Sequence, residues 1–399
     1  MVLPFTTLHS RLETLATQGL QRTRRVLESA QGVHITVDGQ PYLSFCSNDY
    51  LGLANHPQLI AALQKGVRQH GVGAGASHLI SGHSGAHHKL EQALAKFVGK
   101  PAALLFSSGY LANLGAVQAL VGRGDTVFAD KLNHASLNDA ALLSRAQMKR
   151  YRHNDLAHLT QLLQQSGSGR KLILTDAIFS MDGDLAPLPQ LLALSEQYDA
   201  WLLVDDAHGF GVWGENGRGS LFHSKAPLPL GEGLGWGSSP RIIYMATLGK
   251  AAGVSGAFIA AESVVINTLI QRARSYIYTT ASPPALSSAL LVSLKLLQQE
   301  DGRRDQLRKL TGQLRAGLAD LKWQLMRSDS PIQPLLIGDN DEVLALSAAL
   351  RERGIWVPAI RPPTVPQGTA RLRISLSAAH TEQDVQQLIN ALHELAQES

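Results

Sequence analysis

The chain has 399 residues, of which 44% are hydrophobic and 17% charged, a balance typical of a globular protein with two or three domains. Its formal net charge of +4 argues against nucleic acid as a partner, because binding to phosphates requires a concentrated basic surface. The single cysteine, Cys46, excludes an internal disulfide and fits a reducing compartment. Because no run of about 18 apolar residues occurs, we predict no membrane span and a cytoplasmic location.

Helical and extended patterns alternate along the first 283 residues. Residues 57–71 and 84–99 carry apolar side chains at helical spacing. Short, almost continuously apolar runs follow, as expected for strands that are covered on both faces. The predicted strands are 102–108, 125–130, 171–179, 201–206, 241–247 and 256–261. The alternation predicts an α/β fold with a mostly parallel sheet between helices.

The predicted secondary structure changes after Pro283-Pro284, where long helical patterns are followed by a short α+β pattern. Residues 381–398 end the chain as an amphipathic helix, with Thr381 and Asp384 at the spacing of a capping box. Residues 227–240, rich in glycine, proline and serine, predict a surface loop. We therefore expect an N-terminal helix and arm (1–55), a large domain (56–283) and a smaller α+β domain (284–399).

Polar and small residues follow most of the predicted strands. Ligands of open α/β sheets collect beyond the carboxyl ends of the strands, so these residues indicate one shared site. They include Ser107–Tyr110, Asn133 and His134, Ser180, Asp205–Gly209 and Thr247–Lys250.

Lys250 is the most informative of these residues. A lysine beside a packed sheet is costly unless it is paired or chemically used, and a desolvated amine is suited to forming a Schiff base. The common protein-bound aldehyde is pyridoxal 5′-phosphate (PLP), which needs a carboxylate at its ring nitrogen, and Asp205 fits that need. Ser108, Gly109 and Tyr110 offer backbone N–H groups at a helix start for its phosphate. His134 and His208 are candidates for stacking on the ring or bonding its phenolic oxygen.

Two other patterns suggest different ligands. The sequence GVGAGAS (71–77) loosely matches a dinucleotide-binding loop, but it follows a helical pattern and not a strand. The histidines at 78, 83, 87 and 88 suggest a metal site, but no acidic or cysteine partner completes a recognisable spacing, so we interpret them as helix-surface residues.

Several longer motifs resemble the α-oxoamine synthases, fold-type-I PLP-dependent enzymes that condense an amino acid with an acyl thioester. The motifs run in the family's order over residues 20–395 and include FCSNDYLGLANHP, GAGASHLISGHSGAHHKLE, LNHASLNDA, VDDAHGFGVWGENGRG and TLGKAAGVSGAF. The resemblance implies a large PLP-binding domain with a smaller C-terminal domain, and a homodimer with shared active sites.

The resemblance also implies a role for each matching residue. Lys250 would hold PLP as a Schiff base, Asp205 would face the ring nitrogen, His208 the phenolic oxygen, and His134 would stack on the ring. The cofactor phosphate would meet Gly109, Tyr110 and Thr247, with Thr280 supplied by the partner subunit and Ser180 as a further cofactor contact. The substrates would meet Arg22, Asn48, His134, Thr364 and Arg373.

The segment AIRPPTVPQGTARLRISLSAAH (359–380) most resembles the family member of biotin synthesis. It implies the decarboxylative condensation of L-alanine with a pimeloyl thioester, carried either by coenzyme A or by a carrier protein. Other members, which join glycine to acetyl-CoA or succinyl-CoA, remain the first alternative. A binding protein without catalytic activity is a second alternative, which would lack a lysine-linked chromophore.

Overall fold

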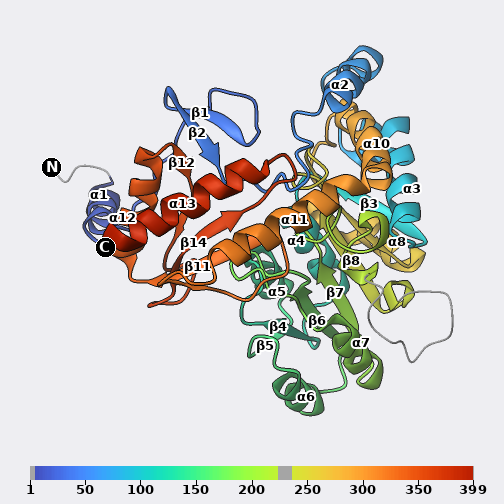
Figure 1. Cartoon of the computed structure of the whole chain (residues 1–399). Coiled ribbons are helices and arrows are strands. Elements are labelled where there is room, and N and C mark those ends of the chain that lie inside the picture. The colour runs from blue at the N-terminus through green and yellow to red at the C-terminus, as the bar shows by residue number, and fades with distance from the viewer. Residues whose placement is uncertain (1–4, 223–235, 399) are drawn as a thin grey trace. The chain divides into compact units, whose positions relative to one another are not determined.

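The structure is a computed structural model that describes residues 5–222 and 236–398 (Figure 1). The chain divides into two compact units. The larger contains Asn48–Ser180 and Asp184–Gln306, and the smaller contains Met1–Ser47, Met181–Gly183 and Leu307–Ser399. Of the predicted loop 227–240, residues 227–235 lie outside the described ranges. Within those ranges, none of the helices combines the length and the apolar character that crossing a bilayer requires.

A seven-stranded sheet forms the centre of the larger unit, in the order β3-β9-β8-β7-β6-β4-β5. All neighbouring pairs from β8 to β5 are parallel, and β9 runs antiparallel to both β3 and β8. The strands are β3 (Ala102–Phe106), β4 (Thr126–Asp130), β5 (Gln147–Tyr151), β6 (Lys171–Asp176), β7 (Trp201–Asp205), β8 (Ile242–Thr247) and β9 (Ala257–Ala261). Burial of every residue of β4 and β9 explains their continuous apolar runs.

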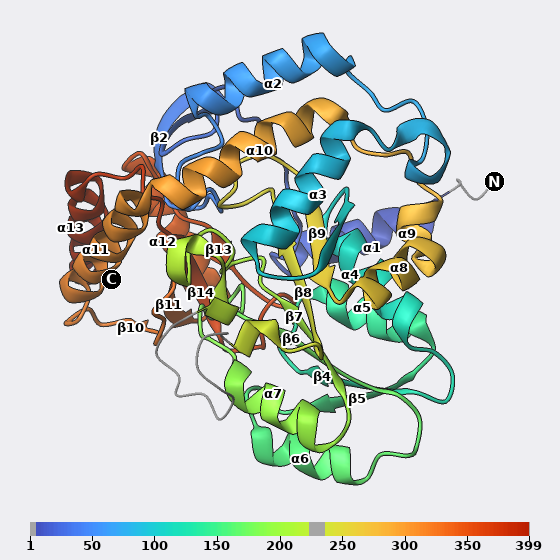
Figure 2. The same ribbon diagram turned by 90° about the vertical axis from the view of Figure 1, so that its right-hand side faces the viewer.

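Helices cover both faces of this sheet (Figure 2). On one face, α4 (Gly109–Leu120) contacts α5 (Ala135–Ser144) and α8 (Ser263–Arg272), and their apolar side chains form one core with β4, β6 and β8. The other helices of the unit are α2 (Pro57–His70), α3 (Gly85–Phe97), α6 (Leu156–Gln164), α7 (Leu188–Gln197), α9 (Arg274–Ile277) and α10 (Pro284–Gln299). The mostly parallel α/β architecture predicted from the alternating pattern is confirmed.

The predicted domain boundary near residue 283 falls inside the larger unit. Helix α10 packs along α2 and also contacts α3, so the unit continues to Gln306. Gly66 of α2 lies against Ser288 and Ala285 of α10, and a Cβ at Gly66 would come within 2.9 Å of the Ser288 side chain. The division between the units therefore falls within α11 (Asp301–Gly317).

The smaller unit is α+β. Helix α1 (Thr6–Thr17) precedes a three-stranded sheet in the order β1-β2-β12, and a four-stranded sheet has the order β10-β11-β14-β13. These strands are β1 (His34–Val37), β2 (Gln40–Ser44), β10 (Gln324–Leu325), β11 (Ile332–Gly338), β12 (Ile355–Trp356), β13 (Ala359–Ile360) and β14 (Ala370–Ser375). Helices α12 (Asn340–Glu352) and α13 (Glu382–Glu398) complete it, and Thr381 and Asp384 form the predicted capping box before α13.

A histidine between two carboxylates ties β4 to the segment after β6. His153 Nδ1 lies 3.0 Å from Asp130 Oδ1, and its Nε2 lies 2.7 Å from Asp184 Oδ2. Burial disfavours the charged ring, but the hydrogen bonds to Asp130 and Asp184 outweigh it and raise the pKa of His153 to about 10. The histidine is therefore a cation in the folded protein at neutral pH.

We predict that His153→Gln destabilises the protein at pH 7 by about 2 kcal/mol, because it removes the cation between two partly buried acids. The raised pKa stabilises the folded state fully below the unfolded value near 6.5, and this contribution is lost as the pH rises to about 10. Urea unfolding of both proteins between pH 6 and pH 10.5 measures it. The difference in unfolding free energy should shrink toward high pH, and a constant difference would contradict the assignment.

Candidate active site

Four side chains form a hydrogen-bonded chain that ends at the lysine. Lys250 Nζ, in the turn after β8, lies 2.7 Å from His208 Nε2, which follows β7. His208 Nδ1 lies 2.7 Å from the hydroxyl of Tyr50, and that hydroxyl donates to Asn48 Oδ1 over 3.1 Å. Tyr50 is fully buried and His208 is 5% exposed, so the chain holds the lysine from inside the protein. The structure thus brings together three predicted site residues, Asn48, His208 and Lys250.

Asp205 is the last residue of β7 and is 4% exposed. Its Oδ2 accepts a hydrogen bond of 2.8 Å from Asn113 of α4, and its Oδ1 accepts one of 3.0 Å from the backbone of Ala207. Asn113 also donates to Ser136 Oγ (2.9 Å), which lies 2.7 Å from His134 Nδ1. One polar network therefore orients the predicted ring-nitrogen ligand and the predicted stacking histidine.

His134 lies close to both charged groups of the site. It is the N-cap of α5, and its backbone N–H donates to Asp176 Oδ2 over 2.7 Å. Surrounding protein atoms desolvate the ring and lower the pKa of His134; the charge of Asp205 opposes this shift and the charge of Lys250 adds to it. The charges of Asp205 and Lys250 therefore act on His134 in opposite directions.

The start of α4 supplies the predicted phosphate donors. Ser108 caps this helix by accepting a hydrogen bond from the backbone of Leu111, and Gly109 and Tyr110 are its first residues. A Cβ at Gly109 would lie 4.0 Å from Cβ of Thr247, so the helix start and the end of β8 face each other closely. A helix N-terminus with unpaired N–H groups favours an anion such as a phosphate.

Of the remaining predicted residues, two belong to the larger unit and three to the smaller unit. Ser180 is half-buried after β6, and Thr280 is exposed and pairs as an isolated bridge with Ser77. Arg22, Thr364 and Arg373 belong to the smaller unit, where Arg373 is buried on β14 and donates to Ser375 Oγ (2.9 Å), while Arg22 and Thr364 are exposed.

Two buried acids and a tyrosine near the site received no role from the sequence, although Asp206 stands among the strand-end residues. Asp206 accepts from the backbone and hydroxyl of Ser220 (2.7 and 2.6 Å) and from the Tyr244 hydroxyl (2.9 Å), so it fixes the loop beside Asp205. Burial raises its pKa to about 7. Burial and the neighbouring Asp205 raise the pKa of Asp176, which pairs with Asp205 across β6 and β7. Tyr50 stands inside the quoted SNDYLG motif, so its position was available from the sequence but its partner was not.

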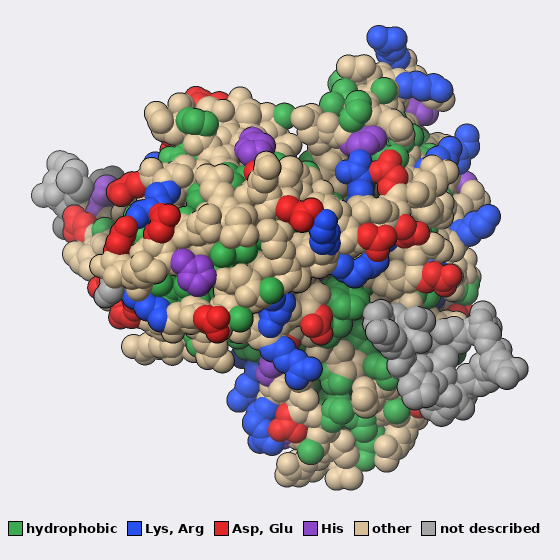
Figure 3. All heavy atoms as spheres, viewed as in Figure 1, with side chains coloured by type: hydrophobic (Ala, Val, Ile, Leu, Met, Phe, Trp, Pro, Cys, Tyr) green, Lys and Arg blue, Asp and Glu red, His purple; other side chains and the backbone are tan. Residues whose placement is uncertain are grey.

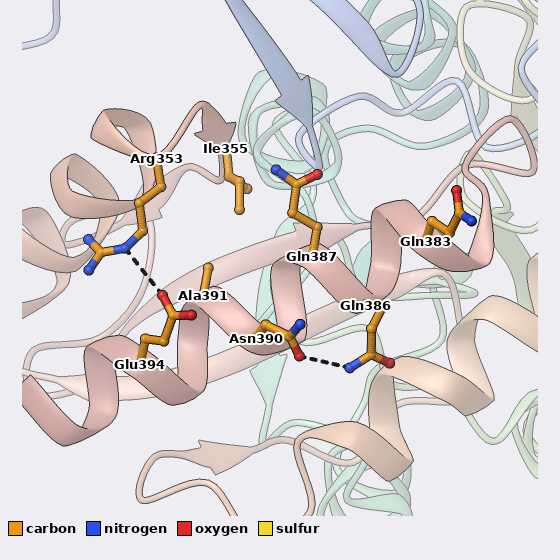
Figure 4. Close-up of a pocket in the computed structure, with 8 residues that line it drawn as sticks. All are labelled: Arg353, Ile355, Gln383, Gln386, Gln387, Asn390, Ala391 and Glu394. Carbon is orange, nitrogen blue, oxygen red and sulfur yellow. Dashed lines mark hydrogen bonds and ion pairs between the residues drawn. The ribbon is translucent and has the colours of Figure 1, made fainter.

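One hollow of the surface lies in the smaller unit, among its described residues. A depression of about 500 Å³ in the smaller unit is lined along α13 by amide side chains and by the ion pair of Arg353 with Glu394 (Figure 4). On the face in Figure 3, basic and acidic side chains are interspersed, which gives no support to a nucleic-acid interface there.

Comparison with known proteins identifies the family. Residues 40–392 match the family described as aminotransferase class I and II. The 8-amino-7-oxononanoate synthase of Nitrosomonas europaea is 61% identical over 95% of this chain and 96% of its own, and that of Nitrosospira multiformis is 62% identical over 96% and 94%.

Among solved structures, one described as SPT with a PLP internal aldimine has a TM-score of 0.90 at 28% identity, covering 99% of this chain and 98% of its own. The 8-amino-7-oxononanoate synthase of Francisella tularensis has a TM-score of 0.76 at 31% identity, covering 90% and 98%. The chain therefore belongs to the class I and II aminotransferase family. Its full-length relatives are 8-amino-7-oxononanoate synthases, and the predicted fold-type-I, PLP-dependent transferase class is confirmed.

We predict that Tyr50→Phe changes the chemistry of the lysine more than it changes stability. Loss of one buried hydroxyl should cost about 1 kcal/mol of unfolding free energy, but it removes the partner that orients His208 toward Lys250. The pH midpoint of the absorbance change of bound PLP should therefore shift, which a spectrophotometric titration measures.

Tyr244→Phe is the matched control, because Tyr244 is equally buried and its hydroxyl bonds Asp206 and not His208. The control should lose similar stability and keep the wild-type titration midpoint. Identical midpoints in wild type and both variants would show that Tyr50 does not influence the titration of the PLP-bound lysine.

Proposed function

We propose that this protein condenses L-alanine with a pimeloyl thioester to give 8-amino-7-oxononanoate, carbon dioxide and a free thiol. The observations that carry the proposal are the amine of Lys250, held by His208 after β8, and the buried carboxylate of Asp205 at the end of the adjacent strand β7. The relatives that share 61% and 62% of their residues over almost the whole chain support this substrate pair. We place the reaction in the cytoplasm.

The residues of the site fit the three chemical demands of PLP. Its aldehyde requires an amine, which Lys250 offers; its ring nitrogen requires an acid, which Asp205 offers; and its phosphate requires donors, which the start of α4 and Thr247 offer. When bound, PLP supplies an electron sink for the pair of electrons left at the substrate's α-carbon.

The chain's own groups then move and hold protons. The amine of Lys250 would act as the general base that removes the α-proton of alanine. Its neighbour His208 orients the amine and is itself held by Tyr50. Asp205 keeps the ring nitrogen protonated, and its partner Asn113 fixes the carboxylate. His134 donates a hydrogen bond to the oxygen of the thioester carbonyl as negative charge develops there.

The other predicted residues supply binding. Arg373 binds the alanine carboxylate, Arg22 and Thr364 meet the acyl chain, and Asn48 lies near the substrate. Gly109, Tyr110, Thr247 and Ser180 contact PLP. Thr280 completes the phosphate site of a second copy, so the active form is a homodimer with shared sites. Because Thr280 is exposed, its hydroxyl is accessible to a second copy of the chain.

Lys250→Ala is expected to abolish turnover of alanine with pimeloyl-CoA and the absorbance of lysine-linked PLP, because the substitution removes the amine that His208 holds. Circular dichroism and the unfolding temperature should stay close to wild type. Wild-type protein is assayed in parallel with alanine and pimeloyl-CoA, glycine and acetyl-CoA or succinyl-CoA, and serine and palmitoyl-CoA. A preference for any pair other than the first would replace the proposed substrates, and full activity of the variant would remove Lys250 from its role.

Asp205→Asn is expected to slow exchange of the α-proton of bound alanine by at least about 100-fold, because a neutral amide cannot keep the ring nitrogen cationic. Proton NMR of alanine in D2O with the PLP-loaded enzyme measures the exchange without any acyl donor. Asp206→Asn serves as the control, since Asp206 bonds Ser220 and Tyr244. It should lower stability and keep most of the exchange rate; equal exchange in Asp205→Asn and wild type would refute the role.

A further inference from the structure

We propose that His83, His88 and Glu91 form a binding site for Zn²⁺ or a similar divalent transition metal at the start of α3. Ligand atoms of the three side chains all lie within 4.8 Å of one another. Two imidazoles and one carboxylate are a ligand set that zinc prefers, with a further position left for water. The three residues are called the α3 metal site below.

The helix register brings the three side chains together. His88 and Glu91 are three residues apart on α3 and therefore share one face of the helix. His83 stands immediately before Ser84, the N-cap residue, and its Nε2 points to Glu91 Oε2 at 3.8 Å. This distance is longer than an ordinary hydrogen bond and leaves room for an ion between the two atoms.

Neighbouring groups orient His83 and Glu91 through hydrogen bonds, as is usual for the ligands of a metal site. His83 Nδ1 lies 3.0 Å from His78 Nδ1, and Glu91 Oε1 accepts from the backbone of Leu105 over 3.0 Å. When His83 donates its Nδ1 proton to His78, its Nε2 carries a lone pair directed toward Glu91. Metal-bound histidines commonly donate their other ring N–H in this way, which fixes the tautomer.

The carboxylate of Glu91 has an electrostatic reason to take a cation. Its side chain is only 12% exposed, so water stabilises its negative charge only weakly. His83 Nε2 lies 3.8 Å from the carboxylate. A divalent cation between them would stabilise the charged form of the carboxylate.

Two other histidines near the α3 metal site, His78 and His87, make contacts with other parts of the larger unit. His87 accepts a hydrogen bond from the backbone of Ser84 at Nδ1 (3.1 Å) and pairs with the carbonyl of Ser282 at Nε2 (2.8 Å), so both ring nitrogens already have partners. His78 is 8% exposed, stacks on Tyr276 and faces His83. These contacts favour the α3 metal site over the neighbouring triplet of His78, His83 and His87.

The site has an accessible side. His88 is exposed and lies 3.0 Å from Gln92 Nε2, a contact between two surface side chains that an ion can replace. The side chain of His83 is 30% exposed. An ion bound here would link the segment before α3 to the first two turns of the helix, and the physical consequence is a more stable helix start.

The test uses full-length, PLP-loaded protein freed of metals with a chelator, and Zn²⁺ is the probe. Isothermal titration should give one site per chain and a rise in unfolding temperature. His88→Gln and Glu91→Gln should each weaken zinc binding at least about tenfold and remove the thermal shift, since losing even an outer contact commonly costs about 10–100-fold. His88 is exposed, so its substitution tests the site without threatening the fold.

Two controls separate this site from other binding. His9→Gln, which removes an exposed histidine of α1, should bind zinc as wild type does. Lys250→Ala should also bind normally, so the outcome does not depend on the proposed reaction. Crystals soaked in Zn²⁺ should show an anomalous peak between the three side chains. Unchanged affinity in both His88→Gln and Glu91→Gln, absence of saturable binding, or a peak elsewhere would overturn the proposal.

Discussion

The parallel register of β6, β7 and β8 is the constraint on which the candidate active site depends. Asp176 pairs with Asp205 across β6 and β7, and Asp205 pairs with Met245 across β7 and β8. Because parallel strands end at the same edge, the turns after them deliver an acid, a histidine and a lysine to one space from segments 45 residues apart. If β8 ran in the opposite direction, Lys250 would lie at the opposite edge of the sheet. The antiparallel strand β9 lies beyond β8, where it leaves this edge intact.

Charges gathered at this edge would destabilise the fold if they were not compensated. Asp176, Asp205 and Asp206 are all buried, and burial alone favours their neutral forms. Each acid is satisfied by a different donor set: the backbone of His134, the amide of Asn113, and Ser220 with Tyr244. The adjacent residues Asp205 and Asp206 therefore belong to two different hydrogen-bond networks. Asp206 bonds Ser220 of the following loop, whereas Asp205 shares a hydrogen-bond network with Asn113, Ser136 and His134.

Sequence patterns predicted the strands that are buried along their whole length. They did not predict features that depend on contacts between distant parts of the chain. Continuous apolar runs identified β3, β4 and β6 to β9, but β5 reads QMKRY and is an edge strand with little burial, so it carries no such signal. The position of Lys250 after a strand indicated the site, but nothing local shows that Tyr50 meets His208 across 158 residues. The boundary expected at Pro283-Pro284 rested on a change in the sequence pattern. In the structure, α10 packs on α2 and therefore belongs to the larger unit.

The histidines before and within α3 show how residues of one type acquire different roles from their contacts. The sequence suggested surface residues, which is wrong for His78 and His87, since both are buried. His87 occupies the N3 position of a capping box, where a glutamate or glutamine is usual, and its ring also reaches the Ser282 carbonyl. That arrangement occupies both ring nitrogens of His87. His83 directly precedes Ser84, whose backbone and side chain both bond His87, so the cap that fixes the start of α3 also fixes the backbone next to this proposed metal ligand.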